Sequence, residues 1–121
     1  MPVLSLRIDF EDGGRIGPGK VALLEKIAET GSISSGARAM GMSYKRAWDL
    51  VDETSRLLGT PVVATRAGGA QGGGAQLTLA GRQVLARFRA IEQAAAKAAH
   101  EHMEAMLEVG TAQADSTPPR R

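Results

Sequence analysis

The sequence predicts a mostly α-helical domain that carries a small pair of β-strands and ends in a long helix. Three observations lead to this fold class. Two short helical segments with a tight turn between them occupy residues 31–58, a glycine-rich stretch between two strand-like segments follows, and residues 78–108 then contain no proline. With two Phe, one Tyr and one Trp in 121 residues, the core must consist mainly of aliphatic side chains and alanine.

The N-terminal segment Val3–Phe10 alternates between polar and apolar residues, and all of its even-numbered positions are apolar. This period of two predicts a half-buried strand, which a turn at residues 11–14 ends. A helix is expected from Pro18 to Gly31. Proline suits the first turn of a helix, whose N–H groups have no partner within the helix, and glycine commonly ends a helix. We expect its buried face to consist of Val21, Leu24, Ile27 and Ala28.

Residues 31–58 predict two helices joined by a turn, the arrangement called a helix-turn-helix. Ser34 is predicted to cap the first helix, and Gly41 to end it in a left-handed conformation. Ser43 is predicted to cap the second helix.

The second of these helices has two different faces. Its apolar positions recur three and four residues apart, so they are expected to pack inward; they are Ala47, Leu50, Val51, Thr54, Leu57 and Leu58. The opposite face pairs Lys45 with Asp49 and Asp52 with Arg56, each four residues apart. Because this face points outward, function is expected to reside there.

Residues 61–65 and 75–77 predict two strands, with the loop Arg66–Gly74 between them. A hairpin placed after a helix-turn-helix is the wing of a winged helix-turn-helix. The loop does not match a phosphate-binding loop, because no Lys-Ser or Lys-Thr pair follows Gly74. The alternative is a disordered surface loop, which is compatible with a wing when DNA is absent.

The last helix is predicted to begin after a capping Thr78 and to continue to about Glu108, a length of about 45 Å at 1.5 Å per residue. Its apolar positions alternate four and three apart, which predicts a seam against a second copy of the helix. The seam residues are Val84, Phe88, Ile91, Ala95, Ala98, His102 and Ala105. The alternative is that this stripe packs only on its own domain.

The small, polar residues 110–121 predict a disordered tail, which leaves a domain of residues 1–109.

Charge and composition narrow the classes of function. The net charge is only +2, but residues 54–91 contain five Arg and no Asp or Glu, which predicts a basic region. No cysteine is present, and His100 and His102 lie on different faces of a helix, so we expect neither a metal site nor a cofactor. No nucleophile, base and orienting group converge, which argues against an enzyme. No stretch is apolar enough to span a membrane, and a cytoplasmic protein is expected.

Two motifs carry a family resemblance. The segments Gly41–Asp49 (GMSYKRAWD) and Gly69–Thr78 (GAQGGGAQLT) resemble the N-terminal DNA-binding domain of the ModE family of molybdate-responsive regulators, whose winged-helix order is shared with LysR-type regulators. The resemblance covers roughly residues 3–107. It implies a regulator of molybdate transport or other molybdenum-related genes that dimerises through its first and last helices and binds a palindromic operator. The molybdate-binding domains that follow the long helix in full-length members are not expected here, so molybdate is not expected to bind this chain alone.

The residues themselves predict where double-stranded DNA would be contacted. Major-groove contacts are expected from the start of the second helix, with Lys45 or Arg46 best suited to a guanine edge and Trp48 as either a contact or a residue at the edge of the core. Phosphate contacts are expected from Ser34 or Ser35 and from the wing. The full set of expected DNA-binding residues is Ser34, Ser35, Ser43, Tyr44, Lys45, Arg46, Trp48, Arg66, Gly72 and Gly73. Two alternatives remain, a protein-interaction module that uses the long helix and a small-oxyanion carrier that uses the glycine loop.

Overall fold

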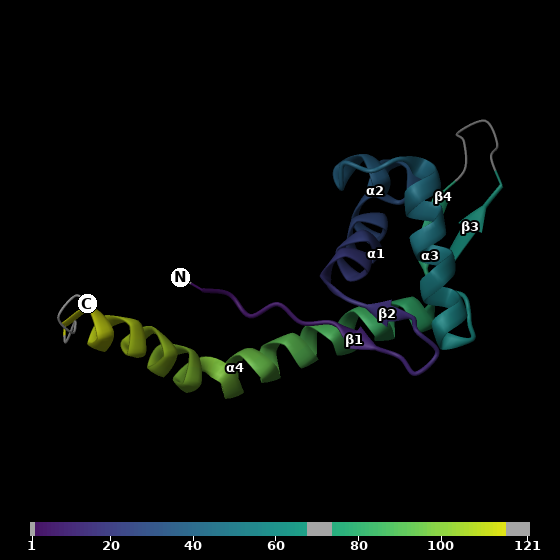
Figure 1. Cartoon of the computed structure of the whole chain (residues 1–121). Helices are drawn as coiled ribbons and strands as arrows, with labels where there is room; N and C mark the ends of the chain where they lie inside the picture. Colours follow the sequence, from purple (N-terminus) through teal and green to yellow (C-terminus); the bar gives the residue numbers. More distant parts are fainter. Residues whose placement is uncertain (1, 68–73, 116–121) are drawn as a thin grey trace.

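Three short helices and a β-hairpin form the body of the molecule, and a long fourth helix leaves it (Figure 1). The structure is a computed structural model that describes residues 2–67 and 74–115, with side chains as far as Thr111. The helices are α1 (Pro18–Thr30), α2 (Ile33–Ala39), α3 (Tyr44–Leu58) and α4 (Leu79–Asp115), and the strands are β1 (Ile8–Asp9), β2 (Arg15–Ile16), β3 (Val63–Arg66) and β4 (Gly74–Leu77). The predicted fold class, mostly helical with a small wing and a long C-terminal helix, is confirmed.

Local signals in the sequence set most of the helix ends. α1 begins at Pro18 and ends at Gly31, whose φ of 80° is left-handed. Ser43 caps α3, because its Oγ accepts a hydrogen bond from the backbone N–H of Arg46 at 3.0 Å. In the same way the Thr78 Oγ1 accepts from the N–H of Gly81 at 3.0 Å at the start of α4. These caps match the predicted ones.

The cap of α2 differs from the prediction. Ser32, and not Ser34, holds this position, since the Ser32 Oγ accepts from the N–H of Ser35 at 2.9 Å. The helix begins at Ile33, whose buried side chain belongs to the core cluster beneath it. Ser34 therefore lies within the first turn of α2 and is exposed.

The core of the helical body is aliphatic, as expected. Leu23 and Ile27 of α1 meet Ala37 of α2 and Ala47 and Leu50 of α3 in one buried cluster. A second cluster joins α1 to the wing through Leu24, Val62 and Leu77. Two details of α1 were predicted wrongly, because Ala28 is exposed and Leu23, which was missed, is almost fully buried.

The N-terminal strand is much shorter than predicted. Only Ile8 and Asp9 form β1, which pairs antiparallel with β2, a strand that the sequence analysis missed. β2 is limited to two residues because Pro18 starts α1 directly after it. The alternation nevertheless has the expected effect on burial. Leu6, Ile8 and Phe10 are half-buried against the cluster of Ile16, Val21 and Phe88.

The wing consists of β3 and β4, paired antiparallel with Val63 opposite Leu77 and Arg66 opposite Gly74. The strands were predicted in the right places, but β3 begins two residues later than expected, after Pro61 and Val62. Residues 68–73 lie outside the described part, so the predicted contacts of Gly72 and Gly73 cannot be placed.

The long helix differs from the prediction in its length and in the role of two residues. α4 continues to Asp115, so residues 110–115 are helical where a disordered tail was predicted. Phe88 is only 2% exposed and packs with Ile16 and Val21, while Val84 packs against the cluster of Leu24, Val62 and Leu77. Their assignment to a dimer seam is therefore corrected, because both side chains belong to the core of their own subunit.

None of the helices in the described part of the chain is both long enough and apolar enough to cross a membrane.

Candidate nucleic-acid interface

The outward face of α3 is polar and charged, as its spacing predicted. Ala47, Leu50 and Thr54 are buried on the opposite face of the helix. On the outward face, the Lys45 Nζ lies 3.1 Å from the Asp49 Oδ2, and the Arg56 Nη2 lies 2.9 Å from the Asp52 Oδ2.

The two aromatic side chains of α3 lie on its surface. Tyr44 is 55% exposed and Trp48 is 46% exposed. Both lie on the side of α3 that faces the wing, because each lines a hollow that also contains Thr65 of β3. Trp48 lines its hollow together with Ile33, Val51 and Val63, so a contact with DNA and a place at the edge of the core both remain predictions for this residue. A planar, half-exposed side chain in this place can make apolar contacts with a ligand that lies between α3 and the wing.

One hollow of about 260 Å³ brings together residues of α2, α3 and the wing. Its lining residues are Ser32, Ile33, Ser34, Tyr44, Thr65, Arg66, Gly74 and Ala75. Three of the predicted DNA-binding residues, Ser34, Tyr44 and Arg66, thus meet at one place. A hydroxyl group, a phenol and a guanidinium group are all hydrogen-bond donors that suit a phosphate oxygen.

Arg66 lies across its partner strand at the base of the wing. Its Nη2 is 3.2 Å from the position that a Cβ atom on Gly74 would take. Glycine at position 74 therefore leaves room for the guanidinium group. Within the described residues, Arg38, Arg46 and Arg66 form no ion pair within 4 Å, so their charges are available to a ligand.

The remaining predicted residues are placed as follows. Lys45 and Arg46 are exposed on the first turn of α3. The hydroxyl group of Ser43 already accepts the capping hydrogen bond of α3, and the N–H of Ser35 donates to Ser32. The sequence analysis missed Ser32 and Thr65, which line the hollow. Ser32 could have been found from the sequence, because it directly follows Gly31, the glycine that ends α1. Thr65 could not, because its place beside the hollow depends on which residues of β3 and β4 pair with each other.

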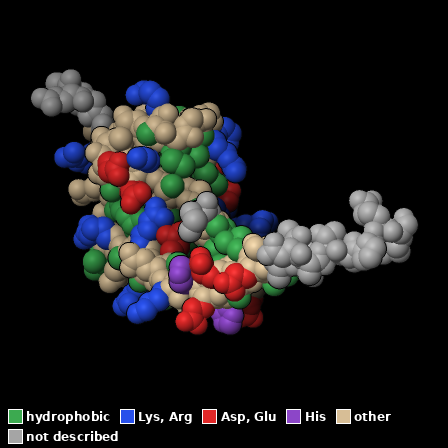
Figure 2. Space-filling view, turned by 90° about the vertical axis from the view of Figure 1, so that its left-hand side faces the viewer, with side chains coloured by type: hydrophobic (Ala, Val, Ile, Leu, Met, Phe, Trp, Pro, Cys, Tyr) green, Lys and Arg blue, Asp and Glu red, His purple; other side chains and the backbone are tan. Residues whose placement is uncertain are grey.

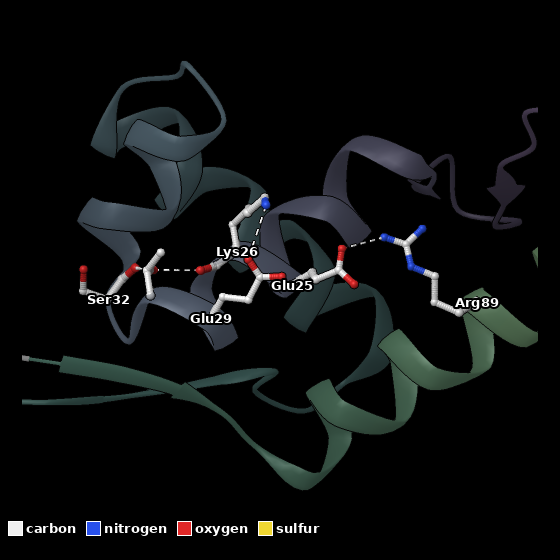
Figure 3. Close-up of polar contacts among 6 residues, drawn as sticks. Glu25, Lys26, Glu29, Ser32 and Arg89 are labelled. Carbon is white, nitrogen blue, oxygen red and sulfur yellow. Dashed lines mark hydrogen bonds and ion pairs between the residues drawn. The ribbon is translucent and has the colours of Figure 1, made fainter.

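A partly exposed ion pair between Arg89 and Glu25 connects α4 to this helical body (Figure 3). The Arg89 Nη2 lies 3.1 Å from the Glu25 Oε1 of α1, and its Nη1 lies 2.8 Å from the Glu92 Oε1 of α4. The hydrogen bond with Glu92, together with the charges of both carboxylates, raises the pKa of Arg89. Arg89 therefore holds its charge and ties α4 to α1.

Charge is distributed unevenly over the molecule. Figure 2 shows acidic and histidine side chains close together on the protruding helix, whereas the visible face of the helical body carries many Lys and Arg side chains with a few acidic ones among them. Glu101, Glu104 and Glu108 all belong to the distal part of α4. A polyanion would therefore be attracted to the body and repelled from the distal part of α4.

Comparison with known proteins agrees with this geometry. Residues 19–82, from α1 to the start of α4, match the family of bacterial regulatory helix-turn-helix proteins of the lysR family. The chain belongs to this family. This LysR-type domain contains the α2–turn–α3 unit and the complete wing, including every residue of the hollow.

Two curated relatives share much of the domain. The chain is 52% identical over 85 residues to the molybdenum-pterin-binding protein MopB of Rhodobacter capsulatus, covering 70% of this chain and 32% of MopB. It is 41% identical over 81 residues to the DNA-binding transcriptional dual regulator ModE of Escherichia coli K12, covering 67% of this chain and 31% of ModE. The resemblance to ModE that the two motifs indicated is confirmed. The chain spans about a third of the length of each of these two relatives.

Among solved structures, the CbnR_DBD-DNA complex resembles this chain with a TM-score of 0.56 at 21% identity, covering 72% of this chain and 94% of CbnR_DBD. Full-length CbnR complexed with its target DNA gives a TM-score of 0.54 at 20% identity, covering 69% of this chain and 27% of CbnR. At this level of identity the likeness establishes the fold.

Proposed function

We propose that this chain is the DNA-binding part of a transcriptional regulator of molybdenum-related genes, and that it binds a palindromic operator as a homodimer. The observation that supports this most strongly is the meeting of Ser34, Tyr44 and Arg66 beside the exposed first turn of α3. The relatives MopB and ModE carry molybdenum or DNA binding in their names.

In this proposal α3 lies in the major groove and the wing lies along the phosphate backbone. Arg46 reads a guanine edge, because a guanidinium group that forms no ion pair within the described residues can donate two parallel hydrogen bonds to O6 and N7. Ser34, Tyr44 and Arg66 donate to phosphate oxygens, which positions α3 without reading sequence. The chain has no catalytic role.

The dimer uses the exposed part of α4. Beyond the core, Ile91 is 42% exposed and Met106 is 72% exposed, and Ala95 and Ala98 lie between them on a helix that leaves the body. Small residues in this stretch allow two helices to approach closely. Two copies would place their α3 helices at half-sites about one helical turn, roughly 34 Å, or a multiple of it apart.

The test is a duplex titration at several salt concentrations. Arg66→Ala is expected to weaken binding to all sequences alike and to lower the salt slope by about one, because one phosphate contact is lost. Arg46→Ala is expected to cost about 1–3 kcal/mol and to relax base preference at one position. Lys97→Ala, an exposed cation on α4 away from the hollow, is the control and should bind as the wild type does. Equal binding by all three variants would contradict the proposal.

A further inference from the structure

The outward face of α3 carries as many carboxylates as cations. Lys45 pairs with Asp49, and Arg56 pairs with Asp52. A helix that served only to attract phosphates would gain from cations and lose from carboxylates, since each carboxylate near the DNA backbone is repelled. The presence of Asp49 on this face therefore calls for a role that a carboxylate can fulfil in a major groove.

Asp49 lies in the second turn of α3, four residues after Lys45 and next to Trp48. Its side chain is 45% exposed, so the carboxylate is accessible to a ligand. The first turns of a recognition helix are the part that contacts base edges. Asp49 is thus nearer to this part than Asp52, whose side chain is 32% exposed and which lies almost one turn further along the helix.

The ion pair leaves hydrogen-bonding capacity on both partners. The Lys45 Nζ donates to the Asp49 Oδ2 at 3.1 Å, which leaves the ammonium group two further donors. In the described part of the chain no hydrogen bond reaches the Oδ1 of Asp49. The pair therefore offers donors and an acceptor side by side on the outward face.

The major groove limits what this acceptor can recognise. Only the N4 amino group of cytosine and the N6 amino group of adenine donate there, while guanine and thymine present acceptors that repel a carboxylate. At adenine the N7 acceptor lies beside the amino group and repels the second carboxylate oxygen, whereas cytosine presents no acceptor in the groove. Cytosine is therefore the base that a carboxylate prefers.

We propose that Asp49 is a specificity-determining residue, which accepts a hydrogen bond from the N4 amino group of a cytosine and holds Lys45 in place to donate to a guanine beside it. This inference rests on the proposed function and names the base step that α3 reads. In this proposal the pair acts as one unit, because the hydrogen bond between the Lys45 Nζ and the Asp49 Oδ2 places the ammonium group beside the carboxylate.

The experiment compares base preferences by selecting bound duplexes from a randomised pool. The wild type is expected to prefer cytosine at one position of each half-site by about 10-fold. Asp49→Asn should lose this preference or shift it to adenine, because an amide both donates and accepts and can pair with adenine N6 and N7. Lys45→Ala should relax the preference at the neighbouring guanine.

Asp52→Asn is the matched control, since it removes the same charge from the other ion pair of the same face. It should retain the wild-type preference for cytosine. If Asp49→Asn bound all sequences more tightly but kept the wild-type preferences, Asp49 would be only an intrahelical partner and the inference would be wrong. Failure of the wild type to select any duplex would instead overturn the proposed function, and this inference with it.

Discussion

A single glycine determines how closely α4 can approach the rest of the domain. Gly81 is buried in the first turn of α4, and a Cβ atom there would collide with the backbone carbonyl oxygen of Val62. The obstacle is backbone, so it cannot move aside as a flexible side chain would. The same carbonyl oxygen accepts a hydrogen bond from the N–H of Thr78 at 3.0 Å, which holds it in position.

We expect Gly81→Ala to lower the free energy of unfolding by about 1–3 kcal/mol, because the helix must shift away from the wing. Gly19→Ala in the first turn of α1 is the control, since no atom lies within 4 Å of its added methyl group. Chemical unfolding followed by circular dichroism measures both. A Gly81→Ala variant as stable as the wild type would show that α4 does not pack against Val62 in solution.

Within α4, the segment packed on the body and the exposed segment beyond it are expected to respond differently when an aspartate replaces an apolar residue. Ile91→Asp places a carboxylate on the exposed stripe and should give folded monomers with weaker operator binding, because the charge would be buried unpaired in the proposed dimer. Phe88→Asp should instead unfold the domain, since Phe88 is buried in its own core.

Sedimentation at micromolar concentration, together with circular dichroism, distinguishes these outcomes. Gln93→Asp introduces the same charge and is the control, because a position two residues along a helix points to a different face. It should remain dimeric. A wild type that sediments as a monomer would contradict the dimer at this site.

The helices and strands differ in how well their ends could be predicted from the local sequence. Both ends of α1 and the start of α3 were predicted because Pro18, Gly31 and Ser43 act through their own backbone or side-chain chemistry. β2 was missed because a strand of two residues has no period to detect. The cap of α2 was misplaced because three of the four residues 32–35 are serine, and only packing of Ile33 decides between them.

The functional site was predicted less completely than the fold. The outward face of α3 and its two ion pairs followed from helical spacing alone. Spacing could not decide the role of Phe88, because a core stripe and a dimer seam have the same three-and-four pattern. The meeting of Tyr44 with Arg66 depends on how the wing packs beside α3, which is a tertiary property.

For the molecule as a whole, we expect molybdate to leave this chain unchanged. A tight oxyanion site needs several donors on a rigid frame from which water is excluded. The hollow beside α3 brings together Ser34, Tyr44 and Arg66, but all three are exposed and water competes for each. Calorimetry with molybdate at constant ionic strength should show no binding and no change in thermal stability, with sulfate as the control anion. Saturable micromolar binding that also changed operator affinity would contradict this expectation.

Arg89 contacts α1 near the point where α4 leaves the body, and most of α4 extends beyond this contact. From Arg89 to Asp115 the helix extends about 39 Å at 1.5 Å per residue. A tilt of about 5° at the contact with Glu25 therefore moves the far end by about 3.4 Å, which is the rise of one base pair. In a dimer joined along α4, the angle at which this helix leaves the body would therefore contribute to the separation of the two recognition helices.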